Sequence, residues 1–426
     1  MEKYAEIAET NSNNLYFIGN QFNNKMTCSK TYQKVLISAT LIVVTATVKA
    51  QTGAPVETKK ANSDYKPAFT GQTRIGSVKT KTPYTVSVIS SELKGPWGMH
   101  VLPDGRLLVS SKPGTMQILK TDGKIDKTIT GFPVVQYEGQ GGLLDVNIDP
   151  HFTTNRMVYW TFAEPGDGGA TLAVAKGKLS ADETRLENVR VIWEAEPRYN
   201  GAGQFGSRII FDRQGDLFVT SGDRQADDIR VKAQDLDATT GKIIHITKEG
   251  KPVPGNPFIG KAGARPEIYA YGFRNPDGLA INPVTGGLWE IEFGPRGGDE
   301  VNLIVPGGNY GWPFVTYGIE YSGKKVYDGI QQRKGTIQPI YYWDPVISPG
   351  CMMFYTGNIT EWKNNMFVGG LSGQHIARLI IRNNKVVGEE RLLADKNERW
   401  RCIATGKDGA IYAATDVGKL YRIAKQ

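Results

Sequence analysis

A short unit recurs along the chain: a turn rich in Asp, Asn and Gly, followed at once by an apolar or alternating segment. Such turns ahead of β-branched and aromatic side chains are typical of a hairpin that leads into a strand. Six copies are present, with turns at residues 103–105, 149–155, 212–215, 282–287, 362–365 and 407–409. Their spacing, roughly 45 to 80 residues, matches β-propeller blades with inserted loops. We therefore predict an all-β fold, a six-bladed β-propeller. The alternative is a pair of β-sandwiches, but that fold would not explain a repeat of this kind.

Composition agrees with a β-rich globular protein. The 426 residues are 40% hydrophobic and 10% aromatic, and they include 50 glycines. Glycine weakens helix interiors and aromatic side chains favour pleated surfaces, so short strands and turns are expected. The formal net charge is +8, and the Lys and Arg residues are scattered among acids. Because no basic stripe is present, we expect no nucleic-acid partner.

The N-terminal region has the features of an export signal. Residues 35–48 form an apolar run, preceded by three lysines and followed by a small-residue Val-Lys-Ala pattern at 48–50. The run is too short to span a bilayer comfortably. We therefore predict that residues 1–50 are an upstream extension and a signal peptide, and that the mature chain is periplasmic or secreted, in a bacterium, with no membrane span. A retained membrane anchor is the alternative.

The rest of the chain divides into two parts. Residues 51–80 are polar with few large apolar side chains, which predicts a flexible lead-in. Residues 81–426 contain all six repeats and form the predicted propeller. After signal removal only Cys351 and Cys402 remain. An oxidising compartment would permit them to pair, but two free buried thiols fit equally well, since a disulfide requires close Cα atoms that only the fold can provide.

Residues 270–313 concentrate glycines, fixed charges and aromatic side chains. Arg274 and Asn275 precede Pro276, whose ring pushes its predecessor out of helical conformation. The Gly294-Pro295 pair offers bare carbonyls, and carboxylates follow a few residues later. Such hard oxygens are the ligands that calcium prefers. The segment is predicted to build a binding site; the alternative is a glycine-rich loop with solvated charges.

Several long motifs, in order, resemble the soluble glucose/sorbosone dehydrogenase family, the periplasmic PQQ-dependent aldose sugar dehydrogenases. They include GPWGMHVLPDGRLLVS, EGQGGLLDVNIDPHF, FGSRIIFD, AYGFRNPDGLAINP, FGPRGGDEVNLIVPGGNYGWP, YYWDP and NERWRCI, and they extend over about residues 96–420. The resemblance implies a six-bladed propeller, in agreement with the repeat count. It also implies a sugar substrate, the cofactors PQQ and Ca²⁺, and a separate electron acceptor.

The resemblance assigns roles where residues match. It implies that PQQ or substrate is held by Gln140, Arg274, Asn275, Arg399 and Arg401, with Tyr321 touching the cofactor. PQQ is a planar tricarboxylate, so guanidinium groups can clasp its carboxylates and stack on its face. The resemblance also implies two metal sites. Gly294 and Pro295 would bind a catalytic Ca²⁺, and Glu300 with Tyr310 would bind a second, structural Ca²⁺.

Three positions depart from the family pattern. Gln204 stands where the family has a histidine that takes the sugar hydroxyl proton, Ser372 where many members have a lysine, and Val346 where a hydroxyl residue is usual. A carboxamide can orient a hydroxyl but cannot act as a general base. None of the four histidines replaces the missing base by position, although His375 follows a loop that could approach the channel. Asp145 and Asp223 are alternative bases that turn formation or strand-end capping also explains.

The resemblance favours an exported PQQ- and Ca²⁺-dependent dehydrogenase that oxidises the anomeric hydroxyl of aldoses. Gln204 and Arg274 are its candidate catalytic residues, with Arg274 stabilising the developing negative charge. The alternative is a propeller that has lost catalysis and binds carbohydrate or a partner. A third interpretation is a hydrolase or lactonase in which channel-bound Ca²⁺ activates water.

Overall fold

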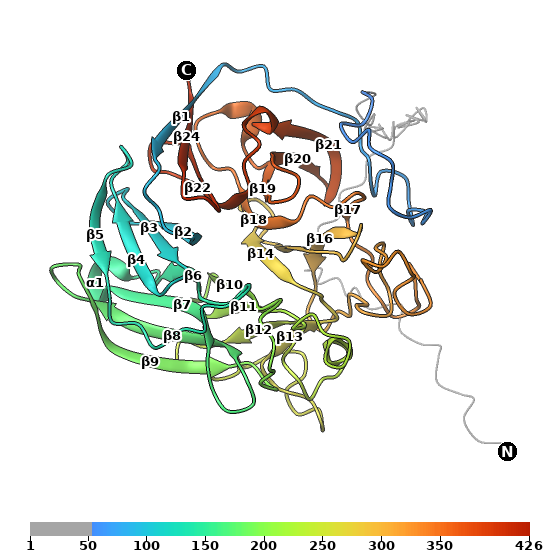
Figure 1. Ribbon diagram of the computed structural model, residues 1–426, viewed down its shortest axis with the longest axis horizontal. Helices are drawn as coiled ribbons and strands as arrows, with labels where there is room; N and C mark the ends of the chain where they lie inside the picture. Colours follow the sequence, from blue (N-terminus) through green and yellow to red (C-terminus); the bar gives the residue numbers. More distant parts are fainter. Residues whose placement is uncertain (1–52) are drawn as a thin grey trace, which may run out of the picture. The chain divides into compact units, whose positions relative to one another are not determined.

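The computed structural model describes residues 53–426 and confirms the predicted six-bladed β-propeller (Figure 1). The predicted extension and signal peptide, residues 1–50, lie outside the described residues. Within residues 53–426, 24 strands form six antiparallel sheets of four strands each.

The sheets follow one another along the chain. The first two contain β2 (Pro96–Val101), β3 (Leu107–Ser111), β4 (Thr115–Leu119) and β5 (Ile125–Ile129), then β6 (Leu143–Ile148), β7 (Met157–Glu164), β8 (Thr171–Leu179) and β9 (Leu186–Glu194). The next two contain β10 (Gly206–Phe211), β11 (Leu217–Ser221), β12 (Lys242–Ile246) and β13 (Ile268–Tyr271), then β14 (Pro276–Ile281), β15 (Leu288–Glu292), β16 (Asp299–Ile304) and β17 (Tyr341–Trp343). The last two contain β18 (Pro349–Phe354), β19 (Met366–Gly370), β20 (Ile376–Arg382) and β21 (Lys385–Leu392), then β22 (Trp400–Thr405), β23 (Ile411–Thr415), β24 (Leu420–Lys425) and β1 (Tyr84–Ser90).

The ring closes in two ways. The first strands of neighbouring sheets (β2, β6, β10, β14, β18 and β22) contact each other in turn, and β22 contacts β2. In addition β1, the earliest strand, pairs antiparallel with β24, so that Tyr84 lies opposite Lys425. Closure leaves no gap between the first and the last blade, and it gathers six strand ends around one channel.

Each sequence repeat corresponds to the turn between the first and second strands of a sheet. In the third sheet, for example, Asp212 Oδ1 accepts hydrogen bonds from the backbone N–H groups of Gln214 and Asp216, at 2.9 and 2.8 Å. An Asp that bonds the backbone two residues on is the expected chemistry of such a turn. The segments predicted to follow the turns are β3, β7, β11, β15, β19 and β23.

Every first strand also has a β-bulge near its start. The pairing register shifts between Gly206 and Ile209 in β10 and between Pro276 and Gly278 in β14, and corresponding shifts occur in β2, β6, β18 and β22. A bulge redirects the side chains on one side of it. These bulges therefore decide which residues at this end of the channel face inward.

The apolar core is divided among the interfaces between neighbouring sheets. On β8, Leu172 and Val174 pack toward the third sheet, whereas Ala173 and Ala175 pack toward the first. Because successive side chains of a strand point to opposite faces, a strand that is buried on both faces is apolar throughout. The described helical turns are short: α1 (Phe152–Asn155) and the 3₁₀ turns η1 (Arg230–Ala233), η2 (Thr360–Trp362) and η3 (Ala394–Lys396). No helix among residues 53–426 is long and apolar enough to cross a membrane.

Arg208 of β10 contacts the first strands of four other blades. Its guanidinium pairs with Asp145 of β6 at 2.9 Å, and it donates to the backbone carbonyls of Asp277 on β14 and Gly350 on β18, at 3.0 and 2.8 Å. It also lies over the ring of Trp97 on β2, 4.3 Å from the centroid. This buried arginine therefore ties five blades together where they meet the channel.

Residues 53–80 run along the propeller. Arg74 donates to the carbonyl of Asp344 at 2.7 Å, and the carboxylate of Asp344 accepts from Asn62 and Ser63. Thr80 bonds Glu390 through both its backbone N–H and its hydroxyl. The flexibility expected for this segment stays a prediction.

Candidate functional site

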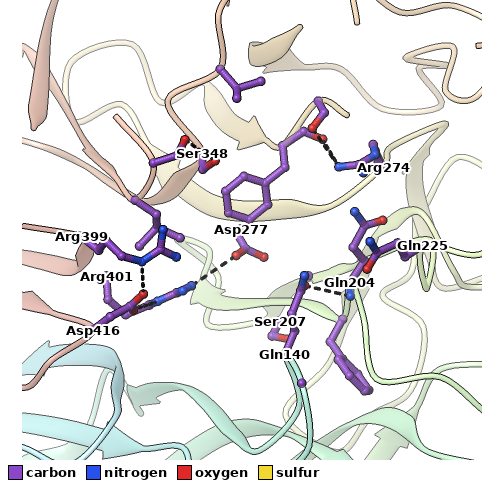
Figure 2. Close-up of a pocket in the computed structure, with 18 of the residues that line it drawn as sticks. Gln140, Gln204, Ser207, Gln225, Arg274, Asp277, Ser348, Arg399, Arg401 and Asp416 are labelled. Atoms are coloured by element: carbon purple, nitrogen blue, oxygen red, sulfur yellow. Dashed lines mark hydrogen bonds and ion pairs between the residues drawn. The ribbon is translucent and has the colours of Figure 1, made fainter. Parts of the chain in front are cut away.

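A cavity of about 470 Å³ opens at the end of the channel where the first strands begin (Figure 2). Its wall is formed by the loops that enter β6, β10, β14, β18 and β22, by the starts of some first strands, and by the loops that follow β3, β11, β15, β19 and β23. The structure brings most of the predicted site residues into this wall: Gln140, Gln204, Arg274, Gly294, Pro295, Tyr321, Arg399 and Arg401, with Val346 and Ser372. Asn275, Glu300 and Tyr310 do not line it.

Two arginines form one side of the pocket. Arg399 and Arg401 each direct Nε to the carboxylate of Asp416, at 2.9 and 2.8 Å. Burial alone would raise the pKa of Asp416, but the two guanidinium groups lower it. Because Asp416 occupies the Nε atoms, the terminal nitrogens of both arginines remain for an anionic ligand.

Asp277 lies between this arginine pair and the opposite wall (Figure 2). Its side chain accepts a hydrogen bond from Asn275 Nδ2 at 3.1 Å, and its second oxygen is 3.7 Å from Arg401 Nη1. Burial raises the pKa of Asp277 to about 7. Asn275 thus lies behind the pocket, where its Oδ1 also accepts the backbone N–H of Gly206 at 2.9 Å.

Gln204 sits on the opposite wall with a left-handed backbone, φ 45°. Its backbone N–H donates to Gln140 Oε1 at 2.9 Å. The orientation of its own amide follows from its neighbours: Asp223 can only accept and Arg274 can only donate, so the nitrogen faces Asp223 and the oxygen faces Arg274. Both ends of this side chain are therefore engaged by protein.

Asp223 is buried behind Gln204. Its carboxylate accepts from Trp312 Nε1 and from the backbone N–H of Gln225, both at 2.7 Å, and it is fully buried. Burial raises its pKa to about 6. Surrounded by donors and absent from the pocket wall, Asp223 acts as a support for Gln204 and Arg274.

Arg274 connects the pocket to the Gly294 segment. Its Nη1 donates to the carbonyls of Phe293 and Gly294, at 3.1 and 2.9 Å, and its Nη2 donates to the hydroxyl of Tyr321 at 3.3 Å. Tyr321 is 64% exposed and so lies at the pocket rim. A side chain at Gly294 would collide with the carbonyls of Gly297 and Gly298, so this turn requires glycine.

Residues 93–422 match the family described as glucose/sorbosone dehydrogenase. The chain belongs to this family. It is 37% identical to the aldose sugar dehydrogenase YliI of Escherichia coli over 335 residues, which are 78% of this chain and 90% of that protein. Among solved structures, a glucose dehydrogenase is similar with a TM-score of 0.76 and 44% identity, over 79% of this chain and 99% of that one. The PQQ-bound aldose sugar dehydrogenase of Streptomyces coelicolor is similar with a TM-score of 0.67 and 25% identity, over 80% of this chain and 98% of that one.

The pocket of this family member suits a planar polyanion. Four cationic side chains line it against two carboxylates, which leaves a formal surplus of two positive charges; the cations are Lys112, Arg274, Arg399 and Arg401. The aromatic rings of Trp97, Phe205 and Phe293 add flat apolar surface. A quinone tricarboxylate such as PQQ requires hydrogen-bond donors for its carboxylates and flat surfaces for its rings, and guanidinium groups beside aromatic side chains supply both.

A smaller cavity behind Arg274 is lined by Glu300 and Tyr310, together with Glu292 and Gly298. Burial and the Glu292 charge raise the pKa of Glu300, and burial raises that of Glu292 to about 8. Within the described residues, Oε1 of the neighbouring Glu290 has no hydrogen-bond partner. The Tyr310 hydroxyl donates to the Leu303 carbonyl at 2.7 Å and accepts the backbone N–H of Val305 at 3.0 Å, so the backbone carbonyl is the ligand that Tyr310 would offer. Buried, mutually repelling carboxylates fit a Ca²⁺ ion.

Sequence reasoning missed Glu290, Asp277 and Asp416. The LWEIEF segment carried a signal for Glu290, since two glutamates alternate within an otherwise apolar strand and must therefore share one face. Asp277 follows the Arg274-Asn275 pair by two residues and could have been found in the same way. Nothing local distinguished Asp416.

The remaining candidates lie outside the pocket. His375 is 2% exposed, its Nδ1 bonds the Gly373 carbonyl at 2.6 Å, and burial lowers its pKa to about 4. Asp145 is buried against Arg208. Cys351 and Cys402 are both buried and unpaired, and burial raises the pKa of Cys351 to about 11. None of these four contributes to the pocket wall.

Proposed function

We propose that the protein is an exported PQQ- and Ca²⁺-dependent sugar dehydrogenase that oxidises the anomeric hydroxyl of aldoses and passes electrons to a separate acceptor. One observation carries the proposal: the ring closure brings Gln140, Arg274, Arg399 and Arg401 from three blades to one pocket. Membership of the glucose/sorbosone dehydrogenase family supports the reaction class.

The pocket residues have distinct roles in this proposal. Arg399 and Arg401 bind carboxylates of the cofactor, while the free amide nitrogen of Gln140 and the hydroxyl of Tyr321 contact ligand oxygens. Bound PQQ supplies a quinone that accepts hydride from the sugar C1. Arg274 stabilises the negative charge that develops as the hydroxyl loses its proton.

The proton requires an acceptor other than Gln204. The resemblance implies a histidine at this position in the family, whereas the amide of Gln204 has no pKa in the accessible range. Asp416 is held by two arginines, whereas Asp277 has one carboxylate oxygen without a hydrogen bond among the described residues and a pKa raised to about 7. Asp277 is therefore the proton acceptor that the pocket offers.

Two calcium sites complete the proposal. Gly294 and Pro295 line the pocket, and their carbonyls would hold an ion beside the quinone, although the Gly294 carbonyl also accepts from Arg274. Glu300, Glu292 and the Tyr310 carbonyl would hold a structural ion in the smaller cavity.

Gln204 also supports a second candidate function, a propeller that binds carbohydrate or a partner without turnover. In both cases the pocket is intact, so binding and chemistry have to be measured separately. We would titrate the full chain with PQQ in the presence of Ca²⁺, then add aldoses and follow the quinone absorbance and a dye acceptor. Sugar-driven reduction supports the dehydrogenase; tight PQQ binding without reduction supports the binding protein; failure of PQQ to bind contradicts the cofactor assignment.

A further inference from the structure

Three potential metal ligands converge at the end of the third sheet that lies away from the pocket. Asp212 and Asp216 belong to the turn between β10 and β11, and His245 lies on β12. One ligand atom from each side chain lies within 4.8 Å of the other two. The site is separate from the pocket because β10 begins at the pocket with Gly206 and ends at this turn.

The surroundings of His245 fix its tautomer. Asn256 Nδ2 donates to the carbonyls of His245 and Pro266, at 2.8 and 3.1 Å, so its Oδ1 must be the atom that faces His245 Nδ1 at 2.9 Å. The Nδ1 atom therefore carries a proton. In the neutral ring Nε2 then carries a lone pair and no proton, and this atom lies 3.0 Å from Asp212 Oδ2. Two lone pairs at this distance repel each other unless a proton or a metal ion lies between or beside them.

A proton on Nε2 would satisfy only part of this cluster. Asp212 Oδ1 is already bonded to two turn N–H groups, which leaves Oδ2 for the cation. Asp216 has no side-chain hydrogen bond within the described residues, and its carboxylate lies close to that of Asp212 and to His245. The nearby ammonium of Lys248 is paired with Asp149 at 2.8 Å. A divalent ion would satisfy Asp212, Asp216 and His245 at once.

We propose that Asp212, Asp216 and His245 bind a divalent transition-metal ion of the Zn²⁺ type. An N···O separation of 3.0 Å allows both atoms to lie roughly 2.0 to 2.1 Å from one ion, at an angle of about 90° that a small shift of either side chain would open to the tetrahedral value. The imidazole selects such ions over Ca²⁺, which prefers oxygen ligands. The Asn256 bond supplies the outer-shell orientation usual for a metal-binding histidine, and Phe218 stacks on the ring, 4.1 Å between centroids. The ion would tie the β10–β11 turn to β12.

The proposal is independent of the dehydrogenase function and is tested by metal titration of the full chain. Excess Ca²⁺ is kept present so that oxygen-rich sites are filled, and Zn²⁺ is added with calorimetry and thermal unfolding as readouts. We expect one Zn²⁺ per chain, a raised melting temperature, and at least a tenfold loss of affinity in Asp216→Asn. The control is Asp104→Asn, an acidic residue in the corresponding turn of the first sheet, which should bind Zn²⁺ as the wild type does.

Co²⁺ provides a second readout, since its visible bands report coordination by nitrogen and oxygen. His245→Gln should abolish these bands, and Asp216→Asn, on a half-buried turn residue, keeps the test valid if the His245 variant does not fold. Absence of Zn²⁺ binding, or binding that Asp216→Asn leaves unchanged, would overturn the proposal and identify the cluster as a protonated His245–Asp212 ion pair.

Discussion

Gln204 accepts hydrogen bonds from both terminal nitrogens of Arg274, at 2.8 and 2.9 Å. The amide thereby holds the guanidinium that the proposed reaction uses for charge stabilisation. Its nitrogen is engaged by Asp223 at the same time. Gln204 therefore acts by positioning Arg274, and removal of the proton falls to another group.

Replacing Gln204 with histidine should raise the turnover of aldoses. An imidazole at this position could donate a hydrogen bond from one N–H to the Asp223 carboxylate and use its other nitrogen as a base. General-base catalysis contributes roughly 10²- to 10⁴-fold, and Asp277 already supplies part of it, so we expect kcat to rise by up to about 10². Dye-linked kinetics on PQQ-loaded protein would measure this, with Gln204→Ala as the control. A variant that binds PQQ normally yet shows no turnover would favour the binding protein.

Loss of a pocket arginine should weaken PQQ binding. A hydrogen bond to a charged group contributes about 1.5 to 3 kcal/mol, so Arg401→Gln should lower the affinity by roughly 10- to 100-fold. Equilibrium titration of the quinone absorbance would measure it. Arg422→Gln is the matched control, because Arg422 pairs with Asp408 on the outer part of the same sheet and does not line the pocket. Equal losses in both variants would contradict the assigned role of Arg401.

Asp277 should make PQQ affinity depend on pH. Burial raises its pKa to about 7, and the charged neighbours Arg401, Arg208 and Asp145 act on it as well. Below pH 7 the side chain is mostly neutral, and above pH 7 it adds a negative charge beside an anionic cofactor. Affinity should therefore fall between pH 6 and pH 8, and this fall should be smaller in Asp277→Asn. Turnover should change in the opposite direction, since a proton acceptor must be ionised. Identical pH profiles in the two proteins would contradict both expectations.

Calcium should stabilise the fold through the buried glutamates. A ligand present at 100 times its Kd adds about 2.7 kcal/mol to the free energy of unfolding. We expect Ca²⁺ to raise the melting temperature by several degrees relative to EGTA, measured by scanning calorimetry. Glu300→Gln should reduce this response, while in EGTA it should be at least as stable as the wild type because it removes one buried charge. An unchanged Ca²⁺ response in Glu300→Gln would exclude the proposed second site.

The Arg208–Asp145 pair should be important for stability. Asp145→Asn leaves a buried guanidinium without its counter-ion, which typically lowers the free energy of unfolding by about 3 to 5 kcal/mol. Chemical denaturation would measure the loss. Asp122→Asn, at an exposed turn, should change stability by no more than about 1 kcal/mol. A similarly small effect at Asp145 would show that the remaining contacts of Arg208 suffice.

Much of the fold could be predicted because its unit is local. The turn chemistry of residues such as Asp212, and the apolar strand after each turn, lie within about ten residues of one another. Six such units define the blade number, and the structure confirms it. The motif around Arg274 also indicated a binding site, since its glycines and charges are close in sequence.

Only the tertiary structure decided which side chains face the pocket. Asn275 and Asp277 are two residues apart, yet the first lies behind the wall and the second lines the pocket. The bulge at the start of β14 separates them, and a shift of one residue in a strand moves a side chain to the other face. The pairing of Asp416 with Arg399 and Arg401 depends on the register between β22 and β23, and the approach of this group to Asp277 of β14 depends on the ring of blades. Sequence alone determined the repeating unit and its number, whereas bulges and ring closure determined the site, because side-chain direction depends on register and long-range contact.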